Sequence, residues 1–191
     1  MRLTDDRSIT VERRVKKNAA LLAGNYTDRR VVYTDGACRD NGLKTAIAGI
    51  GVYFNDPAIN NISEPLEAGT RQTNQRAELY AMIRALEHLD DTVGFQNNQV
   101  VNICTDSYYA MKCMTRWYFI WITNGWKNIH GYKVRNQDLI RRLRKLIQEL
   151  QAVVEFSFVP GHNHIHGNKK ADALARRSVA KQVQRRDEGR Y

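Results

Sequence analysis

Four acidic side chains in this sequence could act together, because each lies where surface acids seldom do. Asp35 and Asp106 each follow a short apolar run that is typical of a buried strand. Glu78 lies among apolar residues of a helical pattern, and Asp172 follows a loop rich in His and Asn. If the two apolar runs are neighbouring parallel strands, Asp35 and Asp106 lie side by side at the carboxyl edge of a sheet.

Carboxylates that converge in this way repel one another and raise one another's pKa values. A divalent cation removes that cost, and oxygen-only ligands favour Mg²⁺ or Mn²⁺. Taken singly, Asp35 followed by Gly36 is an ordinary turn, and Asp172 is an ordinary acid at a helix start. The joint pattern favours a metal site.

The elements that would position these acids follow from hydrophobic periodicity. Strands are predicted at 31–34, 46–54, 62–68, 100–105 and 153–159, with Asp35-Gly36 ending the first. Helices are predicted at 74–89, 107–116, 117–123, 137–150 and 169–183. Three consecutive strands, followed by strands separated by helices, predict an α/β fold. Its five-stranded mixed sheet has three antiparallel and two parallel strands, flanked by helices.

Composition restricts the class of protein. The chain has 191 residues, 42% hydrophobic and 26% charged, which is ordinary globular usage. It contains no apolar run of 18 residues and no signal-peptide pattern, so we expect no membrane association. Three cysteines without a CxxC spacing favour a reducing compartment. We therefore expect an intracellular protein of the cytoplasm or nucleus.

The charge is uneven along the chain. Residues 1–110 carry 13 basic and 14 acidic side chains, whereas residues 111–191 carry 17 basic and 6 acidic ones. Such a basic half favours a polyanionic partner, nucleic acid first and an anionic membrane surface second. We expect a basic, helical N-terminal extension at 1–29, a folded domain that carries the four acids at 30–183 and a basic or polar tail at 184–191.

Five motifs carry a resemblance to a known family. They are YTDGAC (33–38), TNQRAEL (73–79), CTDSYYA (104–110), NGWKN (124–128) and VPGHNHIHGNKKADALA (159–175). In order and spacing they resemble type 1 ribonuclease H over residues 30–180. The resemblance implies the ribonuclease H fold and hydrolysis of the RNA strand of an RNA/DNA hybrid, leaving 5′-phosphate and 3′-hydroxyl ends.

The resemblance also assigns catalytic roles. Asp35, Glu78, Asp106 and Asp172 match the four carboxylates that hold two Mg²⁺ ions, with Mn²⁺ as a substitute. His162 matches a loop histidine used in proton transfer and product release. Two further histidines follow it at alternate positions, and such a run could indicate zinc. No cysteine is near, however, and alternation in a loop supplies no tetrahedral set, so a variable loop is favoured.

Ten further residues match the family's substrate contacts. Cys38, Asn41, Asn74 and Gln75, together with Glu78, match the contacts to the RNA minor groove. Tyr109, Trp117 and Trp121 match the channel for the DNA strand, and Arg71, Thr73 and Asn136 match a pocket for a DNA phosphate. Without the resemblance, the tryptophans could simply be a packing stripe of a helix.

A second interpretation stays open. The same fold could serve as a non-catalytic module that binds hybrids or double-stranded RNA, although the presence of all four acids speaks against it. In either case we expect an RNA/DNA hybrid as the partner, no obligate protein partner and a monomer.

Overall fold

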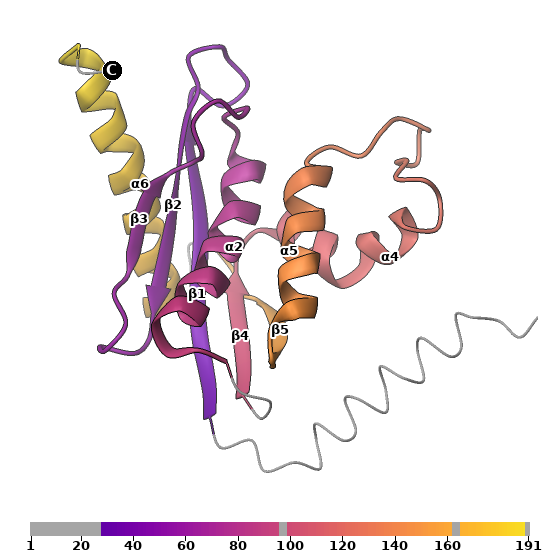
Figure 1. Ribbon diagram of the computed structural model, residues 1–191. Helices are drawn as coiled ribbons and strands as arrows, with labels where there is room; N and C mark the ends of the chain where they lie inside the picture. Colours follow the sequence, from indigo (N-terminus) through magenta and orange to yellow (C-terminus); the bar gives the residue numbers. More distant parts are fainter. Residues whose placement is uncertain (1–27, 96–98, 162–164, 190–191) are drawn as a thin grey trace, which may run out of the picture.

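The computed structural model describes residues 28–95, 99–161 and 165–189 (Figure 1). The helical extension expected at 1–29 falls outside this part, except for its last two residues, which begin the first strand. None of the helices in the described ranges has the length and apolar character that crossing a membrane requires.

A five-stranded mixed sheet forms the centre of the fold. Its strands are β1 (Asp28–Arg39), β2 (Ile47–Phe54), β3 (Ile62–Pro65), β4 (Gln99–Thr105) and β5 (Ala152–Phe158). They are arranged in the order β3-β2-β1-β4-β5. β1, β2 and β3 pair antiparallel, whereas β4 pairs parallel with both β1 and β5. The predicted mixed sheet is therefore confirmed.

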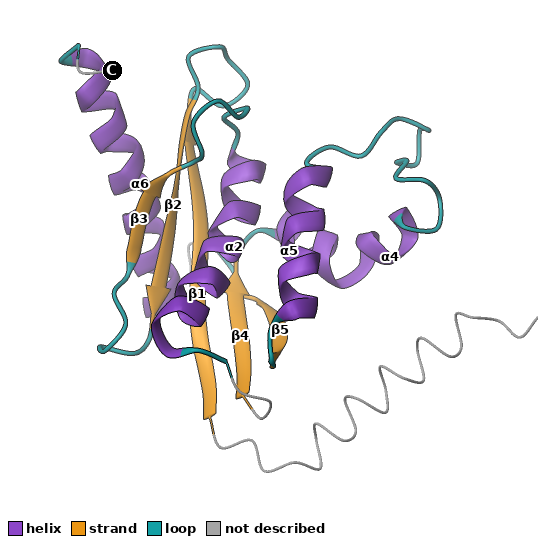
Figure 2. Ribbon diagram, viewed as in Figure 1, coloured by secondary structure: helices purple, strands orange, loops and turns teal. Residues whose placement is uncertain are grey.

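Helices cover both faces of this sheet (Figure 2). They are α2 (Asn74–Val93), α3 (Tyr108–Lys112), the π-helical turn η1 (Cys113–Trp117), α4 (Tyr118–Trp121), α5 (Gln137–Glu149) and α6 (His166–Asp187). α2 and α5 lie on one face and α6 lies on the other. α3, η1 and α4 follow one another directly, so the two helices predicted between 107 and 123 form one continuous helical segment.

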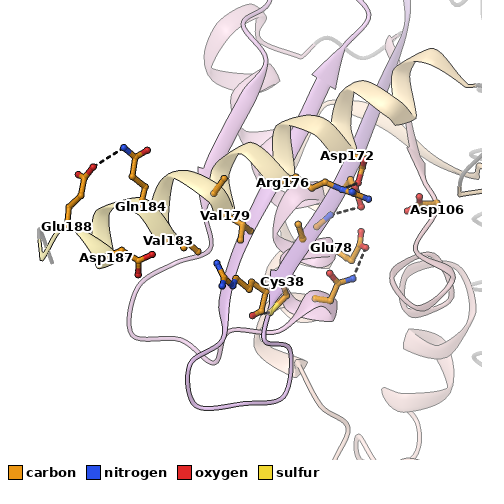
Figure 3. A pocket seen from close by; sticks show the side chains of 16 residues that line it. Cys38, Glu78, Asp106, Asp172, Arg176, Val179, Val183, Gln184, Asp187 and Glu188 are labelled. Carbon is orange, nitrogen blue, oxygen red and sulfur yellow. Dashed lines mark hydrogen bonds and ion pairs between the residues drawn. The ribbon is translucent and has the colours of Figure 1, made fainter.

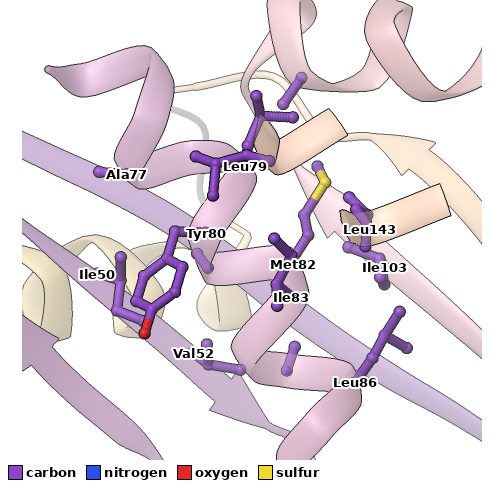
Figure 4. Packing of buried hydrophobic residues seen from close by; sticks show 14 of the residues in the cluster. Ile50, Val52, Ala77, Leu79, Tyr80, Met82, Ile83, Leu86, Ile103 and Leu143 are labelled. Carbon is purple, nitrogen blue, oxygen red and sulfur yellow. The ribbon is translucent and has the colours of Figure 1, made fainter. Parts of the chain in front are cut away.

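The core lies between α2 and the sheet (Figure 4). Met82, Ile83 and Leu86 of α2 are completely buried, and Ile50 and Val52 of β2 are buried as well. Successive strand residues alternate between faces, so the residue between this pair on β2 points to the opposite side of the sheet. That alternation lets one strand pack against two helices.

On the other face, glycines of β2 allow α6 to approach closely. A Cβ atom at Gly51 would lie 2.5 Å from the backbone nitrogen of Ala175 and closer still to the carbonyl oxygen of Ala171. A Cβ atom at Gly49 would meet the Ser178 side chain at 2.6 Å. Small residues on both elements thus set the position of α6, which carries Asp172.

The structure corrects several predicted boundaries. β1 does not end at Asp35-Gly36 but continues to Arg39, because β2 remains paired with it from Val32 to that residue. β3 ends at Pro65 rather than at residue 68. α6 begins at His166 and ends at Asp187, so it includes the first four residues of the segment expected as a tail.

Candidate metal centre

Three carboxylates meet where the pairing of β1 and β4 ends. The last parallel pair joins Tyr33 to Cys104, so Asp35 and Asp106 each lie two residues beyond it. Glu78 reaches the same point from the second turn of α2. One oxygen from each of the three acids lies within 4.8 Å of the others. The structure thus brings together three of the four predicted metal ligands.

Gly36 brings α2 close enough to take part. A Cβ atom at this position would lie 2.5 Å from the backbone nitrogen of Glu78 and 2.8 Å from the Cβ of Ala77. Its own N–H donates a hydrogen bond of 2.8 Å to Oδ1 of Asp35. A residue that sequence reasoning assigned to a turn therefore sits within a strand and fixes the distance between two acids.

The fourth acid, Asp172, lines the same pocket (Figure 3). It is not one of the three carboxylates grouped within 4.8 Å. The pocket has a volume of about 980 Å³ and extends along α6. Oδ1 of Asp172 accepts a hydrogen bond of 2.7 Å from Nε of Arg176, one turn further along the helix. This ion pair occupies one oxygen of a carboxylate that is half-buried.

Asp106 is held by a neighbour that sequence reasoning missed. Nδ2 of Asn168 donates a hydrogen bond of 3.0 Å to Oδ2 of Asp106, and Asn168 is buried. The signal was present in the sequence, because Asn168 precedes Asp172 by four residues on one helix. Residues with this spacing share a helix face, so both side chains point toward the acid cluster.

Burial and mutual repulsion disfavour the charged forms of two of these acids. Burial, followed by the charge of Asp106, raises the pKa of Asp35 to about 7, against the lowering effect of the Gly36 N–H. The pKa of Glu78 is raised well above its usual range by burial and then by the charges of Asp35 and Asp106. Without a cation, the cluster is therefore under electrostatic strain.

The donor set fits a hard divalent cation. Oε1 of Glu78 accepts a hydrogen bond of 3.3 Å from Nδ2 of Asn74, whereas the buried Oε2 has no hydrogen-bond partner among the described residues. A buried carboxylate oxygen without a partner is costly unless a cation takes it up. All three groups offer oxygen only, which matches the preference of Mg²⁺ and Mn²⁺.

This strain predicts that stability in EDTA decreases with rising pH. A carboxyl whose folded pKa exceeds its unfolded value binds more protons in the native state. For Asp35, the stabilising effect of this proton uptake is present below about pH 4 and is lost as the pH rises toward about 7. From pH 5 to 8, the wild type should lose about 1–3 kcal/mol more unfolding free energy than Asp35→Asn.

Thermal or urea unfolding across that pH range measures this difference. Mg²⁺ at pH 8 should restore stability to the wild type, because it binds the folded state only, and should restore less to Asp35→Asn. Parallel pH profiles for the two proteins would contradict the account.

The predicted contacts to the RNA strand gather around the start of α2. Cys38 and Asn74 line the pocket with the acids. Asn41 is exposed, and its Oδ1 accepts a hydrogen bond of 3.2 Å from the backbone N–H of Asn74. Gln75 is exposed beside them on α2. The structure therefore brings these four residues to one region, next to the acid cluster.

The predicted contacts to the DNA strand form an aromatic layer. The ring centroids of Tyr109 and Trp117 lie 6.1 Å apart, and those of Trp117 and Trp121 lie 5.8 Å apart. Nδ2 of Asn136 donates a hydrogen bond of 3.0 Å to the Tyr109 hydroxyl, which ties one predicted phosphate contact to this layer. All three residues are half-buried, so each keeps part of its surface accessible.

The other two predicted phosphate contacts lie just before α2. The Thr73 side chain caps this helix by accepting a hydrogen bond of 3.3 Å from the backbone N–H of Arg76. Arg71 is exposed. Arg76 in turn forms a bidentate ion pair with Asp138 of α5, at 2.9 and 2.6 Å, and so fixes the starts of the two helices together.

His162 belongs to the segment 162–164, which is outside the described residues. Its predicted role is therefore not tested by the structure. Of the three alternating histidines, only His166 is described. Its ring packs edge-on against Tyr53 at 5.9 Å between centroids, at the start of α6. That contact packs the start of α6 against β2.

Comparison with known proteins places the chain in a family. The family model described as RNase H matches residues 27–180. The ribonuclease H of Schizosaccharomyces pombe is 42% identical over 154 residues, covering 81% of this chain and 54% of that protein. Human ribonuclease H1 is 39% identical over 150 residues, covering 76% of this chain and 48% of that protein.

A solved structure agrees with these matches. The crystal structure of LC9-RNase H1, a type 1 RNase H, superposes with a TM-score of 0.62 at 28% identity, covering 82% of this chain and 74% of that one. Fold and acid cluster together define an α/β protein of the ribonuclease H-like kind. The chain belongs to the ribonuclease H family, and it spans about half the length of the first curated relatives it matches.

Proposed function

We propose that this protein is an endonuclease that hydrolyses the RNA strand of RNA/DNA hybrids with two divalent metal ions, leaving 5′-phosphate and 3′-hydroxyl ends. The observation that carries the proposal is the cluster of Asp35, Glu78 and Asp106 within 4.8 Å, with Asp172 in the same pocket. Relatives over most of this chain are named ribonuclease H.

The four acids would hold the ions, Mg²⁺ in the first place and Mn²⁺ as a substitute. Two such ions supply an activated water and stabilise the charge that develops on the leaving oxygen. Asp35, whose carboxylate interacts electrostatically with those of Asp106 and Asp172, would help to hold the ions, and Asn168 would keep Asp106 oriented. Asp172 would have to release Arg176 in part, since that guanidinium now occupies one of its oxygens. His162 would accept and release protons near the product.

Selection of the hybrid would come from both sides of the acid cluster. Cys38, Asn41, Asn74 and Gln75 would contact the RNA strand, whose 2′-hydroxyl distinguishes it from DNA. The aromatic layer would pack against deoxyribose, where an added hydroxyl would clash. Arg71, Thr73 and Asn136 would bind a DNA phosphate. All these groups come from one chain, so we expect a monomer to suffice.

A substrate panel tests the proposal. We expect Mg²⁺-dependent cleavage of the RNA strand in a labelled hybrid, and no cleavage of duplex RNA or duplex DNA of the same sequence. EDTA should abolish the reaction, and the products should carry 5′-phosphates that a phosphatase removes. A protein that binds the hybrid but never cuts it, with either Mg²⁺ or Mn²⁺, would instead be the non-catalytic binding module.

A further inference from the structure

A second cavity lies away from the acids, between α4 and α5, with a volume of about 340 Å³. Figure 1 shows both helices on the side of the molecule away from α6. Aromatic and apolar side chains form one wall of this groove, and cations of α5 form the other. The main lining residues are Tyr118, Ile122, Trp126, Arg141, Arg144 and Lys145.

Two arginines of this groove are stacked on aromatic rings. The guanidinium carbon of Arg141 lies 4.1 Å from the ring centroid of Trp126, and that of Arg144 lies 4.4 Å from that of Tyr118. Stacking fixes the plane of a guanidinium group and directs its N–H donors outward from the edge, in the geometry that binds phosphate. The groove therefore presents cations that are already oriented.

The positive charge of the groove is only partly neutralised. Arg142 also borders it, but this side chain forms ion pairs of 2.8 Å with both Glu67 and Glu87. Lys145 lies 3.6 Å from Glu149, and exposed pairs of this kind are weak. Within the described part of the chain, Arg141 forms no ion pair. The charged residues found to line the groove are all cations.

The groove adjoins the aromatic layer but faces another direction. Each residue of a helix advances by about 100°, so Tyr118 and Ile122 lie about a quarter turn around α4 from Trp117 and Trp121. Trp126 links the two surfaces, because its ring centroid lies 6.1 Å from that of Trp121 and 4.1 Å from the guanidinium carbon of Arg141. A nucleic acid that lies on the tryptophans could thus continue into the groove.

We infer that this groove binds a backbone phosphate of nucleic acid, outside the contacts described above for the hybrid. The inference rests on the proposed function in one respect, namely that the partner is a nucleic acid. Stacked arginines, a lysine and an aromatic wall match a phosphodiester backbone, and such contacts do not depend on base sequence or sugar. The groove would therefore add affinity for hybrid and duplex DNA alike.

The test is a double substitution, Arg141→Gln with Lys145→Gln. Binding of 30-base-pair duplexes, measured by fluorescence anisotropy in EDTA, should weaken about 5- to 20-fold for hybrid and for duplex DNA. The slope of log affinity against log salt should become shallower by about 1–2. The matched control is Lys181→Gln with Arg185→Gln, an exposed Lys and Arg four residues apart on α6. It should change affinity less than about twofold.

Equal losses in the two double variants would overturn the inference, since they would reflect net charge alone. If Arg141→Gln with Lys145→Gln weakened binding to poly-L-glutamate as much as binding to the duplexes, the assignment of the groove to nucleic acid would be overturned. Failure of the proposed function would give a different result. Wild-type protein would then fail to cut the hybrid in Mg²⁺, whereas the two double variants would still differ in their affinity for duplex DNA.

Discussion

Asp35→Asn is expected to lower the rate of hybrid cleavage by about 10³-fold or more. Asp35 belongs to the cluster, and its charge raises the pKa of Glu78 more than the charge of Asp106 does. The amide has the same shape and can still accept the hydrogen bond from the Gly36 N–H. It lacks the negative charge that two cations would share, so the fold should survive while the chemistry fails. Single-turnover cleavage with excess protein measures the loss.

Binding separates this effect from misfolding. In EDTA the variant should bind the hybrid within about threefold of the wild type, because the predicted substrate contacts are untouched. Asp91→Asn is a suitable control, since Asp91 is exposed near the far end of α2. It should leave cleavage unchanged. Cleavage by Asp35→Asn within tenfold of the wild type would show that the cluster is not the reaction centre.

Much of the arrangement could be predicted because it depends on local pattern. Apolar runs predicted all five strands, and the order of strands and helices predicted the mixed sheet. The convergence of Asp35 and Asp106 followed from the rule that neighbouring parallel strands end at one edge. That Glu78 joins them was suggested by its apolar surroundings and assigned by the resemblance, since no local signal says where a helix residue will meet a sheet.

What could not be predicted depends on contacts between distant segments. Asp35-Gly36 has turn chemistry, but pairing with β2 keeps the backbone extended to Arg39. The ion pair of Asp172 with Arg176 requires a rotamer that sequence does not specify. The domain limits at 30 and 183 stay predictions, as do the roles of the ten substrate residues, because no comparison tests them.

Gly36→Ala should damage both the acid cluster and the stability of the fold. The added Cβ would lie 2.5 Å from the Glu78 nitrogen and 2.7 Å from the Ala77 carbonyl carbon, which are backbone atoms that cannot turn aside. α2 must therefore move away from β1 and take Glu78 with it. A displacement of about 1 Å of a catalytic group costs about 10²-fold in rate. Overpacking of this kind should also cost about 1–3 kcal/mol of unfolding free energy.

A matched control keeps the loss of activity separate from the loss of stability. Gly94→Ala makes the same change at the other end of α2, where a Cβ atom meets nothing within 4 Å but the φ of 65° is strained for alanine. It should cost about 1–3 kcal/mol and leave cleavage unchanged at a temperature where both variants are folded. If Gly36→Ala lost stability but kept its rate and its Mg²⁺ requirement, the position of Glu78 would not matter to the reaction. The close approach of α2 to β1 would then serve packing alone.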